Sequence, residues 1–374
     1  MPLIILVGQG YLFALILIGR FIRDRKTSDA LLSLLLIITG LRCTAYMIGF
    51  MGWYDDYPTT KVNYFLVDFS LVLGPLIYFY VKSITIPQFK FLKKDIWHFV
   101  PWVLFLVFRI TIYLYDVQQP GFDEVQNGVL DSAISVELGF FIYITGLISR
   151  LIYFYFAIQV YFQFRKKISQ FFSNTYKVEL NWLRNFLVTY SFLFILKVIF
   201  VVVNDYVVQL SWKQNWWWYF VASLVLVYLG MMGIFSDVGK LSELKPVDEK
   251  DPETQNKGED LEPFKKEVLS YMMSEKAYLN ADLTLNDLAK ELSIPTNVLS
   301  RVINSGFGKN FNDFINEFRI EEVKKSLKDD SLKHLSLLGI AFDCGFNSKA
   351  TFNRVFKKVT GYSPSQYQIE EGLK

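Results

Sequence analysis

Seven long apolar runs occupy residues 1–236, and no other feature restricts the fold of this chain as strongly. A helix needs roughly 20 mostly apolar residues to cross the roughly 30 Å hydrocarbon core of a bilayer. The runs therefore predict seven transmembrane helices, near residues 3–19, 30–52, 63–81, 96–115, 133–162, 185–203 and 216–235. The fifth run is longer than one crossing requires, so we expect it to emerge from the bilayer.

The charged residues are distributed unevenly and divide the chain into three parts. The chain has 39 Lys and Arg and 36 Asp and Glu. Residues 1–236 contain 19 basic and 13 acidic residues, residues 237–262 contain 4 basic and 9 acidic residues, and residues 263–374 contain 16 basic and 14 acidic residues. The acidic and aperiodic middle part is typical of a disordered, solvated spacer. We therefore predict a transmembrane sensor domain (1–236), an acidic flexible linker (237–262) and a soluble domain (263–374) with a net charge of +2.

Lys and Arg in the short loops predict the orientation, because positively charged loops stay on the cytoplasmic side. The loops after the first, third and fifth predicted helices contain 13 of these residues, whereas the opposite loops contain Lys61 and Lys213. The first apolar run follows Met1-Pro2 without a positive region or a small-residue cleavage site, so we expect a retained helix. The N-terminus is therefore predicted outside and the soluble domain in the cytoplasm.

Five ionisable side chains fall inside the predicted membrane helices. Each costs at least about 2.5 kcal/mol at the bilayer centre, so we expect each to face the bundle interior or a cavity. Their net charge of +3 makes them a candidate signal site for an anionic ligand: Arg42, Asp68, Arg109, Arg150 and Lys197. Internal pairing that only fixes the helix packing is the alternative.

Residues for metal binding or catalysis are scarce. The two cysteines, Cys43 and Cys344, lie in different parts of the chain, which excludes an intradomain disulfide and a four-thiolate metal site. His98 and His334 do not form a ligand pair, and the sequence has neither an HExxH nor a CxxC motif. No nucleophile, base and orienting group can be assigned together. We expect no metal, no cofactor and no enzymatic activity.

The soluble part contains a pattern of helix, tight turn and helix in residues 283–304, which read LTLNDLAKELSIPTNVLSRVIN. Thr284 is a plausible N-cap with Asp287 at the third helical position. Ala289 is small enough to let two helices cross closely, as a helix-turn-helix requires. The predicted buried face holds Leu285, Leu288, Ala289, Leu292, Ile294, Leu299 and Val302, and the exposed face of the second helix holds Thr296, Asn297, Ser300 and Arg301.

The same pattern recurs in residues 335–361, which read LSLLGIAFDCGFNSKATFNRVFKKVTG. The small residue is now Ala341, and the turn contains Gly345, which tolerates positive φ. One amphipathic helix over residues 311–327 is predicted between the two units. The exposed face of the last helix holds Lys349, Ala350, Asn353 and Arg354, followed by Lys357 and Lys358.

Residues 283–367 resemble the DNA-binding domain of the AraC family of bacterial transcription regulators. The resemblance rests on LSR at 299–301, Phe311, Arg319, IAFDCGF at 340–346, FNRVFKKVTG at 352–361 and YSPSQY at 362–367. It implies two recognition helices that enter successive major grooves of one double-stranded promoter site. The chain departs from the family at Val323, where alanine is usual, and at Ile303-Asn304, where Phe-Lys is usual.

Side-chain chemistry assigns roles within this interface. Arg pairs bidentately with guanine, Asn pairs with adenine, and Lys reaches guanine or phosphate. The candidate base-reading residues are Asn297, Ser300, Arg301, Lys349, Ala350, Asn353 and Arg354. The candidate phosphate contacts are Thr296, Lys309, Lys357 and Lys358. For any single residue, a solvated helix face is the alternative.

The sequence thus predicts an all-α protein, with a seven-transmembrane-helix bundle followed by a cytoplasmic domain of two helix-turn-helix units. We expect a regulator in the bacterial cytoplasmic membrane that couples a sensed signal to promoter binding. A transporter or membrane enzyme with a regulatory tail, and a docking platform for another protein, are the alternatives. Candidate partners besides DNA and lipid are an anionic small molecule, a membrane protein and a second copy. Because a disordered linker transmits no torque, we favour signalling through oligomeric state or domain docking.

Overall fold

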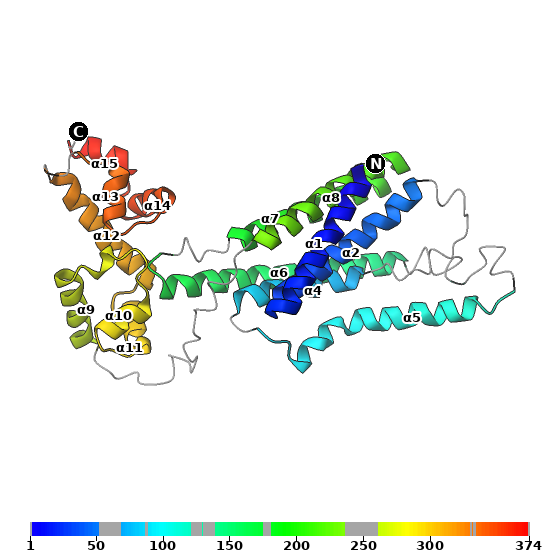
Figure 1. Ribbon diagram of the computed structural model, residues 1–374, viewed down its shortest axis with the longest axis horizontal. Coiled ribbons are helices and arrows are strands. Elements are labelled where there is room, and N and C mark those ends of the chain that lie inside the picture. The colour runs from blue at the N-terminus through cyan, green and yellow to red at the C-terminus, as the bar shows by residue number, and fades with distance from the viewer. Residues whose placement is uncertain are drawn as a thin grey trace. The chain divides into compact units, whose positions relative to one another are not determined.

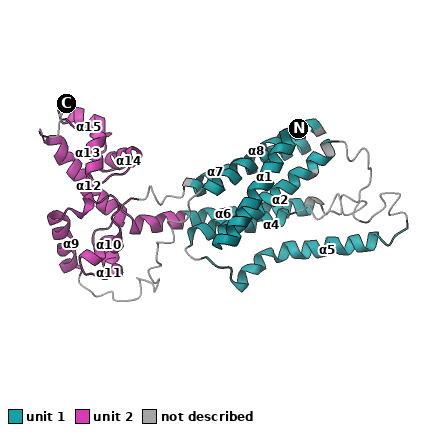
Figure 2. Cartoon of the chain, viewed as in Figure 1, with its two compact units in different colours: residues 1–161, 180–242 teal, residues 162–179, 243–374 magenta. Residues whose placement is uncertain are grey.

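The computed structural model describes residues 2–51, 69–86, 89–120, 129, 139–174, 181–235, 261–329, 331 and 334–372. Within these ranges the chain is helical, and the one β-bridge pairs Phe172 with Thr284. The chain forms two compact units, residues 1–161 with 180–242 and residues 162–179 with 243–374 (Figure 2). Asp68 and most of the linker, residues 236–260, lie outside the described residues.

The first unit is a set of apolar helices (Figure 1). Its α-helices are α1 (Pro2–Asp24), α2 (Thr27–Phe50), α4 (Ser70–Thr85), α5 (Val100–Asp116), the first part of α6 (Gly139–Phe171), α7 (Asn181–Val202) and α8 (Trp212–Phe235). A 3-10 helix (Lys93–Phe99) precedes α5, and a π-helical turn (Val203–Val207) follows α7.

Six described helices are long and apolar enough to cross a membrane, judged by length and composition: Pro2–Asp24, Thr27–Ile48, Lys93–Asp116, Phe141–Phe171, Trp182–Val207 and Lys213–Phe235. Ser70–Thr85 is apolar but shorter, and the residues before it are not among those described. The fifth predicted helix, 133–162, corresponds to α6, which ends at Phe171. Seven crossings therefore remain a prediction.

Helices α1, α2 and α8 pack against one another through small residues. A Cβ atom on Gly10 of α1 would lie 2.3 Å from Leu226 of α8, and one on Gly230 would lie 2.6 Å from Phe13. Glycine at such positions lets helix backbones approach closely. At one end of these helices, Arg20 Nη1 donates to the Ile234 carbonyl over 2.6 Å and Arg20 Nε lies 3.1 Å from Asp29 Oδ2.

The second unit is a compact helical domain. It contains α9 (Glu262–Ser274), α10 (Leu285–Glu291), α11 (Thr296–Arg301), α12 (Phe311–Lys328), α13 (Leu337–Asp343), α14 (Lys349–Thr360) and α15 (Pro364–Glu370). Short helical turns, Ala277–Leu279 and Val302–Gly306, follow α9 and α11. The first half of α12 belongs to a core with α9, α10 and α11, and its second half belongs to a core with α13, α14 and Tyr367. One helix therefore connects both halves of the domain.

Candidate nucleic-acid interface

The first helix-turn-helix unit consists of α10 and α11, as the sequence predicts. Thr284 and Asp287 form a capping box, because the Asp287 N–H donates to Thr284 Oγ1 and the Thr284 N–H donates to Asp287 Oδ2. Such caps typically contribute about 1 kcal/mol to helix stability. The residues predicted for the buried face are all buried: Leu285, Leu288, Ala289, Leu292, Ile294, Leu299 and Val302.

The turn between α10 and α11 adopts a conformation that the sequence pattern did not predict. Ser293 has a φ of 54°, in the left-handed region that non-glycine residues occupy rarely. The Ile294 N–H donates across the turn to the Ala289 carbonyl over 3.0 Å. This bond begins the reversal of the chain that brings α11 onto α10.

Helix α11 presents the predicted set of polar residues. Asn297 is exposed, whereas Thr296, Ser300 and Arg301 are half-buried. The Ser300 hydroxyl accepts a hydrogen bond from Asn304 Nδ2 over 3.2 Å. The helix continues into a π-helical turn at Val302–Gly306, which the periodicity of the sequence does not reveal. Lys309, just beyond this turn, forms an ion pair with Glu317.

The second helix-turn-helix unit consists of α13 and α14, and each of these helices has a serine cap. Ser336 Oγ accepts from the Gly339 N–H, and Ser348 Oγ accepts from the Thr351 N–H. Between them, Gly345 has a φ of 91°, which agrees with the predicted left-handed turn. The predicted base-reading residues of α14 are all exposed: Lys349, Ala350, Asn353 and Arg354.

A cluster of three aromatic side chains fixes α14 on the domain. The ring centroids of Phe352 and Phe356 are 5.5 Å apart, and those of Phe356 and Tyr367 are 5.3 Å apart. All three side chains are buried. Edge-to-face aromatic pairs of this kind add about 0.5–1.5 kcal/mol to the stabilisation from burial. These contacts fix the buried face of α14 on the domain core and so set the direction of its exposed face.

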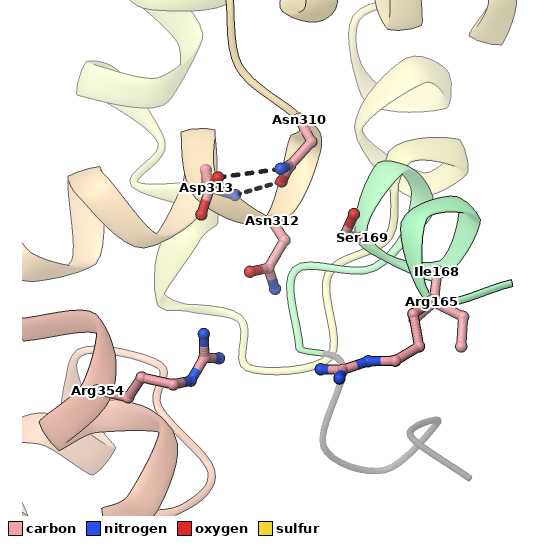
Figure 3. Close-up of a pocket in the computed structure, with 7 residues that line it drawn as sticks. All are labelled: Arg165, Ile168, Ser169, Asn310, Asn312, Asp313 and Arg354. Atoms are coloured by element: carbon pink, nitrogen blue, oxygen red, sulfur yellow. Dashed lines mark hydrogen bonds between the residues drawn. The ribbon is translucent and has the colours of Figure 1, made fainter. Parts of the chain in front are cut away.

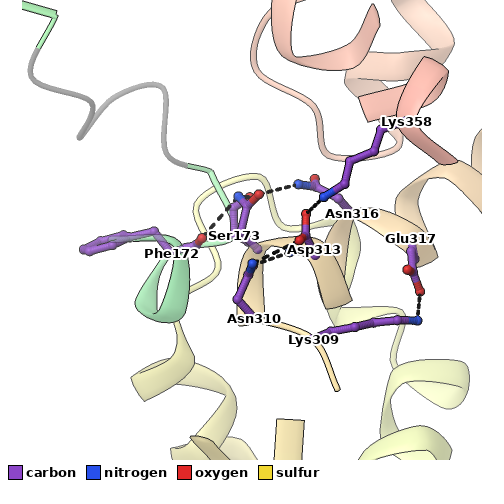
Figure 4. Close-up of polar contacts among 9 residues, drawn as sticks. Phe172, Ser173, Lys309, Asn310, Asp313, Asn316, Glu317 and Lys358 are labelled. Atoms are coloured by element: carbon purple, nitrogen blue, oxygen red, sulfur yellow. Dashed lines mark hydrogen bonds and ion pairs between the residues drawn. The ribbon is translucent and has the colours of Figure 1, made fainter. Parts of the chain in front are cut away.

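Two of the candidate phosphate contacts have acidic partners within the domain. Lys358 Nζ on α14 lies 2.8 Å from Asp313 Oδ1 on α12, and Lys309 pairs with Glu317 (Figure 4). Exposed ion pairs are typically worth no more than about 1 kcal/mol. A DNA phosphate can therefore compete with these carboxylates for either lysine. Lys357 is exposed.

Among the described residues of this domain, Arg319 of α12 is the most completely buried charged side chain, at 1% exposure. Its Nε donates to the Tyr278 carbonyl over 2.7 Å and its Nη2 donates to the Asn280 carbonyl over 2.8 Å. Burial lowers the pKa of Arg319 to about 10, so the guanidinium remains charged at neutral pH. Arg319 therefore joins α12 to the residues that precede α10. Its place in the sequence motif did not indicate this structural role.

Arg354 points into a polar pocket of about 180 Å³, which the sequence did not predict (Figure 3). Arg165, on the end of α6, points into the same pocket from another wall. The remaining lining residues are Ile168 and Ser169 from α6 and Asn310, Asn312 and Asp313 from the start of α12. Residues 162–174 belong to the same compact unit as the helix-turn-helix domain.

The candidate membrane signal residues lie on different helices of the first unit. The Lys197 ammonium on α7 interacts electrostatically with Arg42, Arg150 and Asp205. Lys197 Nζ also lies 5.3 Å from the Trp218 ring centroid, a cation–π distance. Arg109 lies on α5 against the Phe105 ring, and Asp68 lies outside the described residues.

Comparisons with known proteins match the C-terminal region. A family model described as a helix-turn-helix domain matches residues 288–369. An uncharacterized HTH-type transcriptional regulator of Staphylococcus aureus (strain COL) is 32% identical over 91 residues, which are 24% of this chain and 12% of that protein. YijO, an uncharacterized HTH-type transcriptional regulator of Escherichia coli (strain K12), is 35% identical over 86 residues, 23% of this chain and 29% of YijO. No solved structure matches significantly.

The matched stretch spans less than a third of either relative. Together with the geometry above, it shows that the C-terminal part is an AraC-type helix-turn-helix domain. Domains of this kind bind DNA and are not enzymes. The matches therefore support a DNA-binding transcription regulator.

Proposed function

We propose that this chain is a membrane-anchored, sequence-specific transcription regulator of the bacterial cytoplasmic membrane. Residues 1–236 would sense a signal as a seven-helix bundle, and the domain at 263–374 would bind promoter DNA in the cytoplasm. The observation that carries the proposal is the pair of helix-turn-helix units joined by α12, each with polar residues on its second helix. Two such helices can enter successive major grooves of one DNA site.

The side chains on these helices suit base reading. In this proposal Arg301 and Arg354 pair with guanines, and Asn297 and Asn353 pair with adenines, because these pairings match two hydrogen-bonding groups at once. Ser300, Lys349 and Ala350 complete the base-reading surface, and Thr296, Lys309, Lys357 and Lys358 hold phosphates.

The surface of the first unit supports a place in the membrane. Four apolar side chains along α7 are each more than half exposed in the described structure: Val188, Phe192, Ile195 and Ile199. Their spacing of three or four residues puts them on one face of the helix. An apolar stripe of this kind in water would be costly, whereas hydrocarbon accommodates it. The excess of Lys and Arg in alternate loops favours a cytoplasmic C-terminus.

The grouping of Arg42, Arg150 and Lys197 supports an anionic ligand as the signal. Arg42 and Arg150 both act electrostatically on Lys197, and like charges repel strongly where the dielectric is low. An anionic small molecule that binds there would relieve this repulsion. A second copy of the chain or another membrane protein would be further partners of the bundle.

The test is DNA binding by the full-length protein in lipid nanodiscs. The probes are DNA from the gene's own upstream region and a scrambled duplex of the same composition, compared over a salt series. Arg301→Ala and Arg354→Ala should each weaken specific binding by about 1–3 kcal/mol, or roughly 5- to 150-fold. Lys325→Ala, which removes the same charge from an exposed site on α12, should leave specific binding nearly unchanged. Equal affinity of the wild type for both duplexes would contradict the proposal.

A further inference from the structure

We propose that the end of α6 and the residues after it, Arg165–Asn174, form an inhibitory docking segment on the DNA-binding domain. In the docked state this segment lies across a pocket from Arg354 and hinders the seating of DNA on that side of α14, which lowers the affinity for DNA, and its release raises the affinity. The inference rests on the proposed function and adds to it the surface through which the membrane part controls DNA binding. The segment and the domain belong to one compact unit.

Apolar side chains hold the segment on the domain. Ile168 is 2% exposed, and Phe171 packs against the core that contains α10 and α11. Ile168 and Phe171 are three residues apart and therefore share one face of α6. Arg165, Lys166 and Lys167 are exposed. Phe171 thus fixes the end of α6 on the domain, and Ile168 is buried beside the pocket that Asn312 also lines.

Backbone pairing joins the segment to the first helix-turn-helix unit. Phe172 forms an antiparallel bridge with Thr284, the N-cap of α10. The Ser173 N–H donates to the Leu283 carbonyl over 3.1 Å, and Ser173 Oγ donates to the same oxygen over 2.6 Å. A displacement of the segment therefore acts directly on the start of α10.

Two side chains of α12 complete the docking site by binding Ser173. Asn312 Nδ2 donates to the Ser173 carbonyl over 2.7 Å, and Arg319 Nη2 donates to Ser173 Oγ over 3.1 Å. Ser173 is 1% exposed and Asn312 is 8% exposed. Buried polar groups need hydrogen-bond partners, and Ser173 supplies partners to both of these donors. The segment therefore fits a built site on the domain.

Docking places the end of α6 across a pocket from Arg354 of α14. Arg354 points into the pocket of about 180 Å³ whose opposite wall carries Arg165, Ile168 and Ser169 (Figure 3). A recognition helix reads bases only when it lies in a major groove about 12 Å wide. A helix such as α6 is itself about 10–12 Å in diameter. The space between Arg354 and α6 is far too small to hold a duplex, so DNA that contacts Arg354 from this side requires α6 to move away.

The same helix connects this docking site to the membrane part. Helix α6 is continuous from Gly139 to Phe171, and its apolar stretch is long enough to cross a bilayer. A shift of this helix in the membrane would move Ile168 and Phe171 with it. This route does not need the acidic linker to transmit force.

The first experiment undocks the segment without changing the domain. In full-length protein in nanodiscs, Ile168→Asp should bind the gene's upstream DNA more tightly than the wild type, by a factor within the range of about 5 to 150 that is typical of coupled sites. Gln163→Asp adds the same charge at an exposed position of α6 and should bind no more tightly than the wild type. Weaker or unchanged binding by Ile168→Asp would overturn the inference, and weaker binding would instead indicate that α6 assists DNA contact.

The second experiment locks the segment in place. Residues opposite each other in an antiparallel bridge are close enough for a disulfide, so the pair Phe172→Cys and Thr284→Cys should crosslink, while the native Cys43 and Cys344 are buried. The oxidised pair should bind DNA at least about 5-fold more weakly than the same protein after reduction, and DNA should slow the crosslinking, because coupling is reciprocal.

Equal DNA binding by the oxidised and reduced forms would overturn inhibition alone. Absence of specific DNA binding by the wild type, by Ile168→Asp and by the reduced pair would overturn the inhibition and the proposed function together. Failure of the pair to crosslink in the absence of DNA would show that the segment is not docked, whatever the outcome of the DNA-binding assays.

Discussion

Gly345 lies directly against Tyr278: a Cβ atom on Gly345 would be 2.6 Å from the Tyr278 carbonyl oxygen. The same atom would be 2.9 Å from Nε of Arg319, and the φ of Gly345 is 91°. Two independent restraints therefore require glycine here, the left-handed backbone and the close approach of another backbone segment. The turn between α13 and α14 and the loop before α10 thus meet at Arg319.

Gly345→Ala should destabilise the domain by about 2–4 kcal/mol, because it adds a steric clash to the strain of about 1–2 kcal/mol expected at positive φ. Hydrogen exchange of the α13 and α14 amides in the full-length protein measures this loss. Gly361→Ala is the matched control, since Gly361 has a φ of 82° and no atom within 4 Å of the added Cβ. It should lose only the strain, and equal losses in the two variants would refute the steric argument.

Glu322 should make the stability of the domain depend on pH. Burial alone raises the pKa of Glu322, but hydrogen bonds from Lys276 and Tyr278 outweigh it and hold the pKa below its usual 4.5. Lys276 Nζ lies 2.6 Å from Glu322 Oε1, and the Tyr278 hydroxyl donates to Glu322 Oε2 over 3.0 Å. The folded state therefore favours the charged form, and this stabilisation is present above about pH 4.5 and is lost as the pH falls through the folded pKa.

Glu322→Gln should therefore lower the thermal unfolding temperature at pH 7, by an amount equivalent to about 1 kcal/mol. The difference from the wild type should shrink as the pH falls below 4.5 in calorimetric scans of the nanodisc-embedded protein. Glu321→Gln serves as the control, because Glu321 pairs with Lys324 on the exposed face of the same helix. A difference that stayed constant with pH would show that the Glu322 carboxylate is not the cause.

Lys357 and Asn353 should affect DNA binding in different ways. Lys357→Ala should weaken binding to all sequences about equally and reduce the salt slope by about 1, as the loss of one phosphate contact requires. Asn353→Ala should leave the salt slope unchanged and reduce the preference for one adenine position. Binding isotherms on single-base variants of the site, at several salt concentrations, separate the two effects. A sequence-selective defect in Lys357→Ala would reverse these assignments.

The signal site gives a prediction for cells. Arg42→Gln and Lys197→Gln should change expression from the target promoter severalfold in cells that receive the signal, while the DNA affinity of the proteins purified without the signal stays within about twofold of the wild type. The reason is that these residues lie in the unit formed by residues 1–161 and 180–242, whereas the DNA-reading residues lie in the other unit. Lys213→Gln, at an exposed position of α8, is the control. Unchanged expression in both variants would exclude these cations from signalling.

The sequence predicted the helix-turn-helix domain well because its information is local. Helical periodicity identified the buried face of the first helix-turn-helix unit, and cap chemistry identified Thr284 and Asp287. The left-handed turn at Gly345 was predicted from residue type. In each case the physical cause lies within about one or two helical turns of the residue concerned.

The docking segment was not predicted because its contacts are remote in sequence. Ser173 meets Leu283 and Arg319 across more than 100 residues, and a short polar stretch after a helix carries no periodic signal that would indicate a partner. The left-handed Ser293 was missed for a different reason: tertiary packing of α10 on α11 imposes a backbone conformation that serine does not itself prefer.

Hydroxyl-radical footprinting of the full-length protein in nanodiscs, on DNA from its own upstream region, tests the central claim most directly. Two recognition helices should protect two blocks of backbone on one face of the duplex, about one helical turn or 10 base pairs apart. Arg301→Ala should remove protection mainly in one block and Arg354→Ala mainly in the other. A single protected block, or loss of both blocks in either variant, would contradict a domain in which two helix-turn-helix units each read their own groove.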